Sequence, residues 1–462
     1  MNKQTNYSQA VKQGILDWVE DRFGGRVIRV EQVIRWRPIW RVDFDKGGVL
    51  HSLAFKGPRD GNVIPYPVEH EYRMLQVLRD NGMPVPTVHG VCEFPSAVVM
   101  DWMPGGRDPG MVGMAAEDES RMSDERWAAS LEYMDWLATM HRIEPRKFVA
   151  AGLEMPVTAE DIALNGFERF YRLGRDKGIV DPFMDFCAAW LRRNVPDRER
   201  VAFVTGDCCQ FLSEGDKVTA LLDVEIGYLG DPLSDLACFL GRHPVENLGD
   251  IPALFRRYEQ ASGEAIDLEA LAYQTVVFMA VAFYFPVLTL PVTQPGGDWV
   301  ESQIQVAFCG RRCAEAMAGI IDVDLEHSMS LPAPAATPLE DMALAKLEEE
   351  IAHMPTTEYF QPWKRDMVAK LPAWLTNQLH YGRWAEQQDL DDAEKLLGHR
   401  PDNRAEADKA LSRFVLEAGP EQDADLVRFF HRRTLRECHI CVGPDAPTEH
   451  LIFARFEPVT DL

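Results

Sequence analysis

VAFVTGDCCQFLSEGDKVTALLDVEIGYLGDPLSDLACF, which runs from Val201 to Phe239, is the stretch from which the fold is predicted. A short apolar strand leads to Asp207, and a second apolar strand, Val218 to Leu222, leads to Asp223. We interpret these as two strands joined by a short loop, each ending in a carboxylate. This arrangement predicts that Asp207 and Asp223 lie close together at one edge of the fold.

A carboxylate pair of this kind suits phosphoryl transfer from ATP. One carboxylate orients and deprotonates an acceptor hydroxyl, and the other holds the Mg²⁺ that bridges the phosphates. We therefore predict that Asp207 is the catalytic base and that Asp223 is a metal ligand.

The same stretch resembles the catalytic core of the aminoglycoside phosphotransferase and choline kinase-like family, whose members are distant relatives of protein kinases. T-G-D ends at Asp207, D-V-E begins at Asp223, and G-D-P-L-S-D-L-A spans Gly230 to Ala237, in the family's order and approximate spacing. The match is specific because three linked motifs recur with hydrophobic strands between them. The resemblance implies an α+β, bilobal protein-kinase-like fold, with a small mixed β-sheet N-lobe and a mainly helical C-lobe.

The catalytic loop departs from the family pattern at two points. Thr205 stands where the family usually has His, and this change affects the order of the loop more than its chemistry. The loop is also about two residues short and lacks the usual Asn, so Gln210 is the nearest side-chain amide that could offer oxygen to Mg²⁺. The alternative function is therefore a nucleotide-binding pseudokinase that acts as a regulatory or scaffold protein.

By the same resemblance, Asp235 would brace the catalytic loop from below, whereas Asp231 would have a structural role at a helix start. His141, at the end of a predicted helix, is expected to pack or cap rather than to act as a base.

The sequence upstream matches an N-lobe. A leading helix to about residue 24 is followed by period-two runs from Arg26 to Phe55, a helix over Val68 to Asn81, and strands at 88–91 and 97–100. The resemblance implies that Lys56 contacts the α/β-phosphates, that Glu71 rather than Glu69 pairs with Lys56, and that the hinge backbone binds adenine. The hinge comprises Met100, Asp101, Trp102 and Met103.

The segment Ile34 to Trp40, IRWRPIW, lacks the glycines that let a phosphate-covering loop approach an anion. Its arginines could contact phosphate directly or lie on the surface beside the tryptophans, and the sequence leaves both interpretations open.

At 462 residues the chain predicts two or three domains. We predict an N-lobe over 1–103, a C-lobe over 104–330, a Pro/Ala linker over 331–338 and a mostly helical C-terminal domain of unknown role over 339–462. Near the end, His439 to Val442 and His450 to Phe456 are predicted as a hairpin, with Cys438 and Cys441 as small apolar residues of a strand.

The net charge and the cysteine content of the chain limit the kinds of partner and the compartment that we expect. A formal charge of −25 argues against a nucleic-acid partner, which would be repelled.

The apolar run Val276 to Leu290 contains Pro286 and predicts a buried helix rather than a membrane span. Nine cysteines, without a predicted secretory leader, indicate reduced thiols and a cytoplasmic protein. The expected partner is a small-molecule hydroxyl acceptor, a metabolite or an antibiotic-like compound, and a homodimer is possible.

Overall fold

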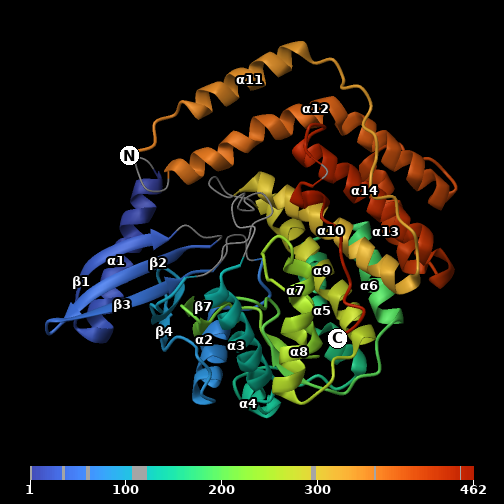
Figure 1. Ribbon diagram of the computed structural model, residues 1–462. Helices are drawn as coiled ribbons and strands as arrows, with labels where there is room; N and C mark the ends of the chain where they lie inside the picture. Colours follow the sequence, from blue (N-terminus) through green and yellow to red (C-terminus); the bar gives the residue numbers. More distant parts are fainter. Residues whose placement is uncertain are drawn as a thin grey trace.

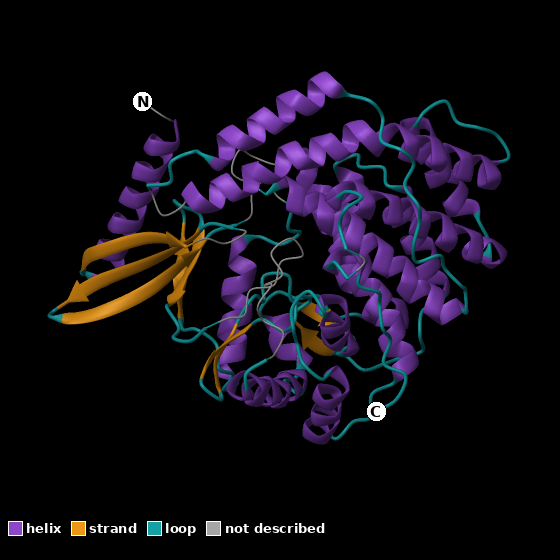
Figure 2. Ribbon diagram, turned by 45° about the horizontal axis from the view of Figure 1, so that its top comes forward, coloured by secondary structure: helices purple, strands orange, loops and turns teal. Residues whose placement is uncertain are grey.

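The computed structural model describes residues 3–33, 37–58, 63–106, 122–292, 298–357, 361–447 and 449–462. The chain folds into a small lobe that carries the β-sheet and a larger helical lobe, and further helices follow the larger lobe (Figure 1, Figure 2). The predicted α+β, bilobal fold is therefore confirmed. Residues 34–36 of the IRWRPIW segment lie outside the described residues.

The N-lobe is built on an antiparallel five-stranded sheet. Its strands lie side by side in the order β1 (Arg26–Val33), β2 (Ile39–Lys46), β3 (Val49–Lys56), β5 (Ala97–Asp101) and β4 (Val88–Cys92). Because side chains alternate along a strand, β5 has two buried faces. Ala97 and Val99 pack in one cluster with α1 (Lys3–Phe23), and Val98 and Met100 pack in another with α2 (Val68–Asp80). The sheet thus lies between two helices. This packing fixes the position of Lys56 at the end of β3.

Four short strands carry the catalytic motifs, and their pairing differs from the prediction. They are β6 (Ala202–Val204), β7 (Phe211–Glu214), β8 (Lys217–Leu221) and β9 (Tyr228–Gly230). The strand before Asp207, β6, pairs with β9, whereas the strand before Asp223, β8, pairs with β7. The two carboxylates therefore do not follow strands that are direct neighbours. The chain between them forms its own hairpin, since the turn at Gly215, with φ 55°, returns β8 along β7.

Helices make up the rest of the C-lobe. They are α3 (Asp124–His141), α4 (Pro145–Ala150), α5 (Ala159–Asp176), α6 (Pro182–Arg193), α7 (Leu233–Arg242), α8 (Ile251–Ser262), α9 (Leu268–Thr289), the 3₁₀ turn η2 (Leu290–Val292) and α10 (Trp299–Ile321). Several begin where a polar side chain accepts a first-turn N–H, as Ser123 does for α3 and Asp267 does for α9. α7 begins at Leu233, later than predicted, and Asp231 accepts the Leu233 N–H from outside the helix.

The most apolar helix, α9, lies inside the C-lobe. By length and composition it is the one described helix that could cross a membrane, and 67% of its most apolar stretch is buried. Its contacts are with α5, α6, α7 and α10, as expected for the central helix of a lobe.

The chain beyond residue 321 first runs without regular structure and then forms helices. These are α11 (Pro338–Ala352), α12 (Gln361–Leu397), α13 (Arg404–Glu417) and α14 (Asp423–Val442), with the 3₁₀ turns η3 (Pro420–Gln422) and η4 (Leu451–Phe453). Figure 1 shows α11 running beside the long α12, while α13 and α14 pack against the C-lobe helices α6 and α10. Residues on both sides of the Pro/Ala segment thus share one hydrophobic cluster. The domain boundaries themselves stay a prediction.

The predicted C-terminal hairpin is wrong. Residues 439–442 are the last turn of α14, so Cys438 and Cys441 lie on a helix, and 451–453 form the turn η4. A short apolar run fits either period, and the turn residues that suggested a hairpin instead end the helix at Gly443, with φ 82°.

Candidate active site

Lys56 joins the two lobes. It is the last residue of β3, where pairing with Val98 of β5 holds the backbone, and its side chain is buried. Lys56 Nζ lies 2.6 Å from Glu71 Oε1 and also donates a hydrogen bond to Asp223. Glu69, the other carboxylate considered in this helix, is exposed. The structure therefore brings together three of the predicted site residues, two from the N-lobe and one from the C-lobe.

Arg37 is a site residue that sequence reasoning did not identify. Only 8% of it is exposed; its Nη2 donates to Glu71 Oε2 at 2.8 Å, and its Nη1 forms an ion pair with Glu225. Of the two interpretations of the IRWRPIW arginines, the surface position is wrong for Arg37, which is buried, whereas direct contact with phosphate stays a prediction. Burial raises the pKa of Glu71 above its ordinary value, and the positive charge of Arg37 opposes that rise.

The catalytic loop is braced from behind by one buried carboxylate. Asp235, on α7, accepts hydrogen bonds from the Thr205 N–H at 3.0 Å, the Thr205 hydroxyl at 2.9 Å and the Gly206 N–H at 3.2 Å. His141 Nε2 lies 3.1 Å from the same carboxylate, and its Nδ1 lies 2.8 Å from the Tyr258 hydroxyl. The side chain of Thr205 therefore bonds to the Asp235 carboxylate that braces the loop, and His141 packs behind the loop.

Asp207 is held by a cation that the sequence did not indicate. Arg242, at the end of α7, donates to Asp207 Oδ1 with one amino group and to Glu246 with another. The side chain of Asp207 is 26% exposed, so its carboxylate is held in place yet still reachable from solvent. The guanidinium thus donates one charge-assisted hydrogen bond to each of two carboxylates, and the bond to Asp207 orients the candidate base.

Gln210 and Asp223 lie on adjoining backbone. The Leu222 N–H donates to the Gln210 carbonyl at 2.9 Å, which places the residue before Asp223 beside a residue three positions after Asp207. Asp223 has φ 56°, a conformation that is rare for a residue with a side chain and is often found at functional sites. The hairpin thus brings the backbone before Asp223 beside Gln210, and the closeness of the Asp207 and Asp223 carboxylates stays a prediction.

The residues predicted to hold Mg²⁺ are chemically suited to it. Gln210 Oε1 is buried and, within the described residues, accepts no hydrogen bond. A buried carbonyl oxygen without a donor is costly, and a hard cation that prefers oxygen ligands would satisfy it. Gln210 Oε1 and the Asp223 carboxylate are both oxygen ligands of the type that Mg²⁺ prefers.

The hinge leaves one donor available. Met100 and Asp101 are the last two residues of β5, and Trp102 and Met103 follow the strand. The N–H groups of Asp101 and Trp102 donate to backbone carbonyls at 2.9 and 3.0 Å. Among the described residues, no acceptor engages the N–H of Met103. Within the described part of the hinge, the Met103 N–H is therefore available to a further acceptor.

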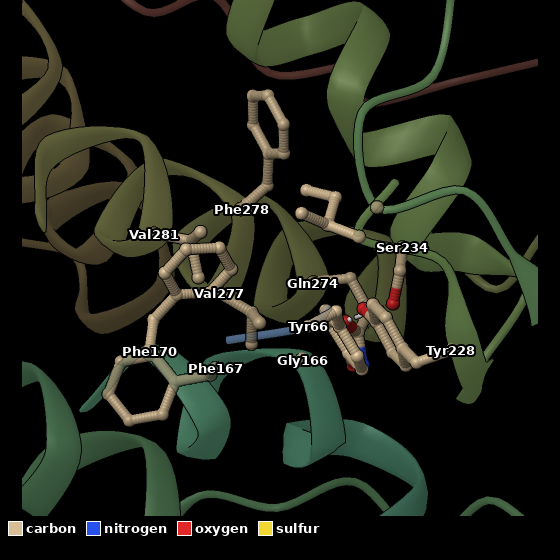
Figure 3. A pocket seen from close by; sticks show the side chains of 12 residues that line it. Tyr66, Gly166, Phe167, Phe170, Tyr228, Ser234, Gln274, Val277, Phe278 and Val281 are labelled. Carbon is tan, nitrogen blue, oxygen red and sulfur yellow. Dashed lines mark hydrogen bonds between the residues drawn. The ribbon is translucent and has the colours of Figure 1, made fainter. Parts of the chain in front are cut away.

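A small pocket adjoins the catalytic loop at Gly206, the residue before Asp207. Figure 3 shows Phe167, Phe170, Val277, Phe278 and Val281 along one part of its wall, and Tyr66, Tyr228, Ser234 and Gln274 along another. The lining contains no charged side chain, and the Tyr66 hydroxyl is buried without a hydrogen-bond partner among the described residues. The wall of this small pocket is therefore mostly apolar, with a few uncharged polar groups.

Part of the chain matches a known family. Residues 55–273 match the sequence model of the family described as "Phosphotransferase enzyme family". The chain is 26% identical over 368 residues to acyl-CoA dehydrogenase family member 10 of Mus musculus, covering 75% of this chain and 31% of that protein. It is 27% identical over 209 residues to family member 11 of Rattus norvegicus, covering 42% of this chain and 25% of that protein. The chain thus spans about a third or less of these curated relatives.

Solved structures with a similar arrangement include a macrolide 2′-phosphotransferase of Brachybacterium faecium, at 18% identity and a TM-score of 0.44, covering 64% of this chain and 97% of that one. A thermostable mutant of an aminoglycoside phosphotransferase has 15% identity and a TM-score of 0.44, covering 66% and 98%. The resemblance seen in the sequence is confirmed by the family match. Residues 55–273 form a phosphotransferase-family region, with Lys56 near its start and Asp207 and Asp223 inside it.

Proposed function

We propose that the protein is a small-molecule kinase that transfers the γ-phosphate of ATP to a hydroxyl group. The observation that carries this proposal is the meeting of Lys56 with both Glu71 and Asp223, from opposite lobes. A lysine held by a helix carboxylate and facing a metal-binding aspartate is the arrangement that orients nucleotide phosphates for transfer.

The N-lobe would position the nucleotide. Adenine would bond to the hinge backbone at Met100 to Met103, where the Met103 N–H is the available donor. Lys56 would move its hydrogen bond from Asp223 to the α/β-phosphates while Glu71 keeps the ammonium aimed. Arg37 supports this geometry because it ties Glu71 to Glu225, so the helix α2 and the D-V-E motif are held at one spacing.

The C-lobe would carry out the transfer. Asp223 and Gln210 would hold Mg²⁺, which neutralises phosphate charge when bound. Asp207 would accept the proton of the acceptor hydroxyl as that oxygen attacks the γ-phosphorus and ADP leaves. Arg242 acts as a positioning residue, because it bonds to the carboxylate and not to the substrate. Preorganised charge and orientation supply most of the acceleration in such a reaction.

The acceptor is proposed to be a hydroxylated small molecule, either a metabolite or an antibiotic-like compound. The nine free cysteines support the proposal that the protein works in a reducing, cytoplasmic compartment.

A nucleotide-binding pseudokinase is the second candidate. Two observations favour it: Asp207 is engaged by the partly buried Arg242, and the shortened loop lacks the family's Asn, with Gln210 as the nearest side-chain amide. A scaffold role would then fall to the helices that follow the C-lobe.

One pair of measurements separates the two functions. ADP release is measured over a panel of hydroxylated metabolites, and the melting temperature is measured with ATP in the presence and absence of Mg²⁺. A kinase shows Mg²⁺-dependent stabilisation by ATP and acceptor-dependent ADP release, both lost in Lys56→Met. Stabilisation that ignores Mg²⁺, with no ADP released for any acceptor, identifies the pseudokinase.

A further inference from the structure

Three potential metal ligands meet outside the active site, where α10, the segment after it and α14 converge. They are Glu315 on α10, His327 on the irregular segment and His431 on α14. Glu315 Oε1 lies 3.4 Å from His431 Nε2 and 3.6 Å from His327 Nδ1. All three ligand atoms lie within 4.8 Å of one another.

These separations fit a small divalent ion. Zn²⁺ binds imidazole nitrogen and carboxylate oxygen at about 2.0–2.2 Å, so tetrahedral ligand atoms lie roughly 3.3 Å apart. Both distances from Glu315 are close to this value. The two imidazoles must approach each other slightly, and His327 can do so because its side chain is 30% exposed on a segment without regular structure.

Glu315 and His431, the two buried residues of this cluster, have surroundings that suit such an ion. The Phe456 N–H donates to Glu315 Oε2 at 2.7 Å and Arg311 donates to Oε1, so the carboxylate is oriented by its neighbours as ligating carboxylates usually are. His431 is 1% exposed; its Nε2 contact at 3.4 Å is long, and its Nδ1 has no partner among the described residues. A buried imidazole bonded this weakly is costly unless a further group engages it.

A basic side chain also contacts the cluster, because Arg311 donates a hydrogen bond to Glu315 Oε1. Arg311 opposes a cation at this place, but it also donates to the carbonyls of Ile452 and Ala454 and is held there.

We propose that Glu315, His327 and His431 bind Zn²⁺ or a closely similar divalent transition-metal ion, with water at the fourth position. The ion would tie α14 and the segment after α10 to the C-lobe, and would thereby fix the C-terminal helices to the catalytic half of the molecule. This site differs from the proposed Mg²⁺ site at Asp223 in its residues and in its chemistry, because two of its three ligands are imidazoles whereas the Mg²⁺ site offers oxygen alone.

The test is equilibrium dialysis of the full chain against Zn²⁺ with metal analysis, and the visible d–d spectrum with Co²⁺ in place of Zn²⁺. The variants are His327→Ala, His327→Cys and, as controls, His353→Ala at an exposed histidine elsewhere and Asp223→Asn at the kinase site. We expect one Zn²⁺ per chain and a tetrahedral Co²⁺ spectrum in the unchanged protein and in both controls. His327→Ala should weaken Zn²⁺ binding at least about tenfold and lose the spectrum, and His327→Cys should keep both because a thiolate replaces the lost ligand.

Three outcomes would overturn the proposal: no Zn²⁺ bound by the unchanged protein, equal binding by His327→Ala, or loss of binding in Asp223→Asn. The last would assign the ion to the kinase site. Circular dichroism of His327→Ala checks that the variant is folded, which is expected since the replaced side chain is partly exposed.

Discussion

Asp207 and Asp223 each bond to a basic side chain that comes from a different element. Arg242 holds Asp207 from the end of α7, and Lys56 reaches Asp223 from β3. In the first case the cation stays with its carboxylate through the proposed reaction, whereas in the second it moves to phosphate. In the proposed reaction, the ion pair at Asp207 is therefore permanent and positions the carboxylate, whereas the ion pair at Asp223 is broken when nucleotide binds.

Replacing Asp207 by Asn tests the base. The amide keeps the shape of the side chain but cannot accept the hydroxyl proton, so turnover should fall by about 10²-fold or more while ATP binding is nearly unchanged. ADP release gives the rate, and the ATP-dependent shift in melting temperature gives binding. Asp216→Asn, in the exposed hairpin turn, is the matched control and should behave as the unchanged protein. Full activity in Asp207→Asn would remove Asp207 from the mechanism.

Thr205 permits a test of the loop brace. Its hydroxyl donates to the buried carboxylate of Asp235 at 2.9 Å. Thr205→Ala should lower the free energy of unfolding by about 1–2 kcal/mol, because a hydrogen bond to a charged group is lost, while Thr205→Ser should retain most of it. Urea denaturation followed by fluorescence measures both. Equal losses in the two variants would mean that the methyl group, rather than the hydroxyl, holds the loop.

At the scale of elements, α2 is positioned by contacts on both sides of the site. Its Glu71 bonds to Lys56 and Arg37, and its His70 Nε2 lies 2.8 Å from the carbonyl of Gly227, just beyond the D-V-E motif. The helix therefore links the N-lobe sheet to the catalytic strands. Its carboxylate is expected to control nucleotide use, and its histidine is expected to control stability.

Glu71→Gln should lower kcat/KM for ATP by about tenfold or more, because the ammonium of Lys56 loses a charged hydrogen bond that aims it. The fold should persist, since the amide still fills the site and can bond to Arg37. Glu69→Gln, two residues away and exposed, is the control and should leave kcat/KM unchanged. If both variants lose activity equally, Glu71 has no special role.

His70 predicts a pH dependence of stability. Burial lowers the pKa of His70 from 6.5 to about 4, opposed in part by its bond to Gly227. Between these values the unfolded chain takes up a proton that the folded protein does not. The free energy of unfolding contributed by His70 is therefore fully present above pH 6.5, falls as the pH drops towards about 4, and is constant below that. The total loss is about 3 kcal/mol at most.

Urea denaturation at a series of pH values, in the unchanged protein and in His70→Gln, isolates this contribution. The glutamine amide can replace the bond to Gly227 but does not titrate, so the variant should lose less stability between pH 6.5 and 4. Superimposable pH profiles would assign the acid sensitivity to other groups.

At the scale of the whole molecule, the C-terminal helices share the C-lobe core. Phe430 of α14 is fully buried and stacks on Phe183 of α6, with ring centroids 4.8 Å apart. A long irregular segment and the Pro/Ala stretch separate these helices from the C-lobe in sequence, but not in packing.

Phe430→Ala should therefore destabilise the catalytic half as well as α14. We expect a loss of about 3–5 kcal/mol in the free energy of unfolding, the usual cost of removing a buried aromatic ring. Kinase activity and the fluorescence transition should be lost together on heating. Leu416→Ala, at a half-exposed position of α13, is the control with little effect. Two separate transitions, with the catalytic one unchanged, would show that the C-terminal helices are energetically independent.

The sequence by itself determined most of the fold and half of the candidate site. Period-two and helical patterns placed the N-lobe strands and the C-lobe helices, and three linked motifs placed Asp207, Asp223 and Asp235 because each motif is local in sequence. The hairpin predicted at the C-terminus failed because a short apolar run and a turn carry too little pattern to separate a strand from a helix end.

Only the tertiary structure decided which basic side chains complete the site and how the C-terminal helices are held. Arg37 meets Glu71 and Glu225, Arg242 meets Asp207, and His431 meets Glu315, and each contact joins elements far apart in the chain. The local sequence around a charged side chain does not indicate which residue will be its partner. The attraction between the two opposite charges becomes strong only where both are buried side by side, and that arrangement arises only when the elements pack.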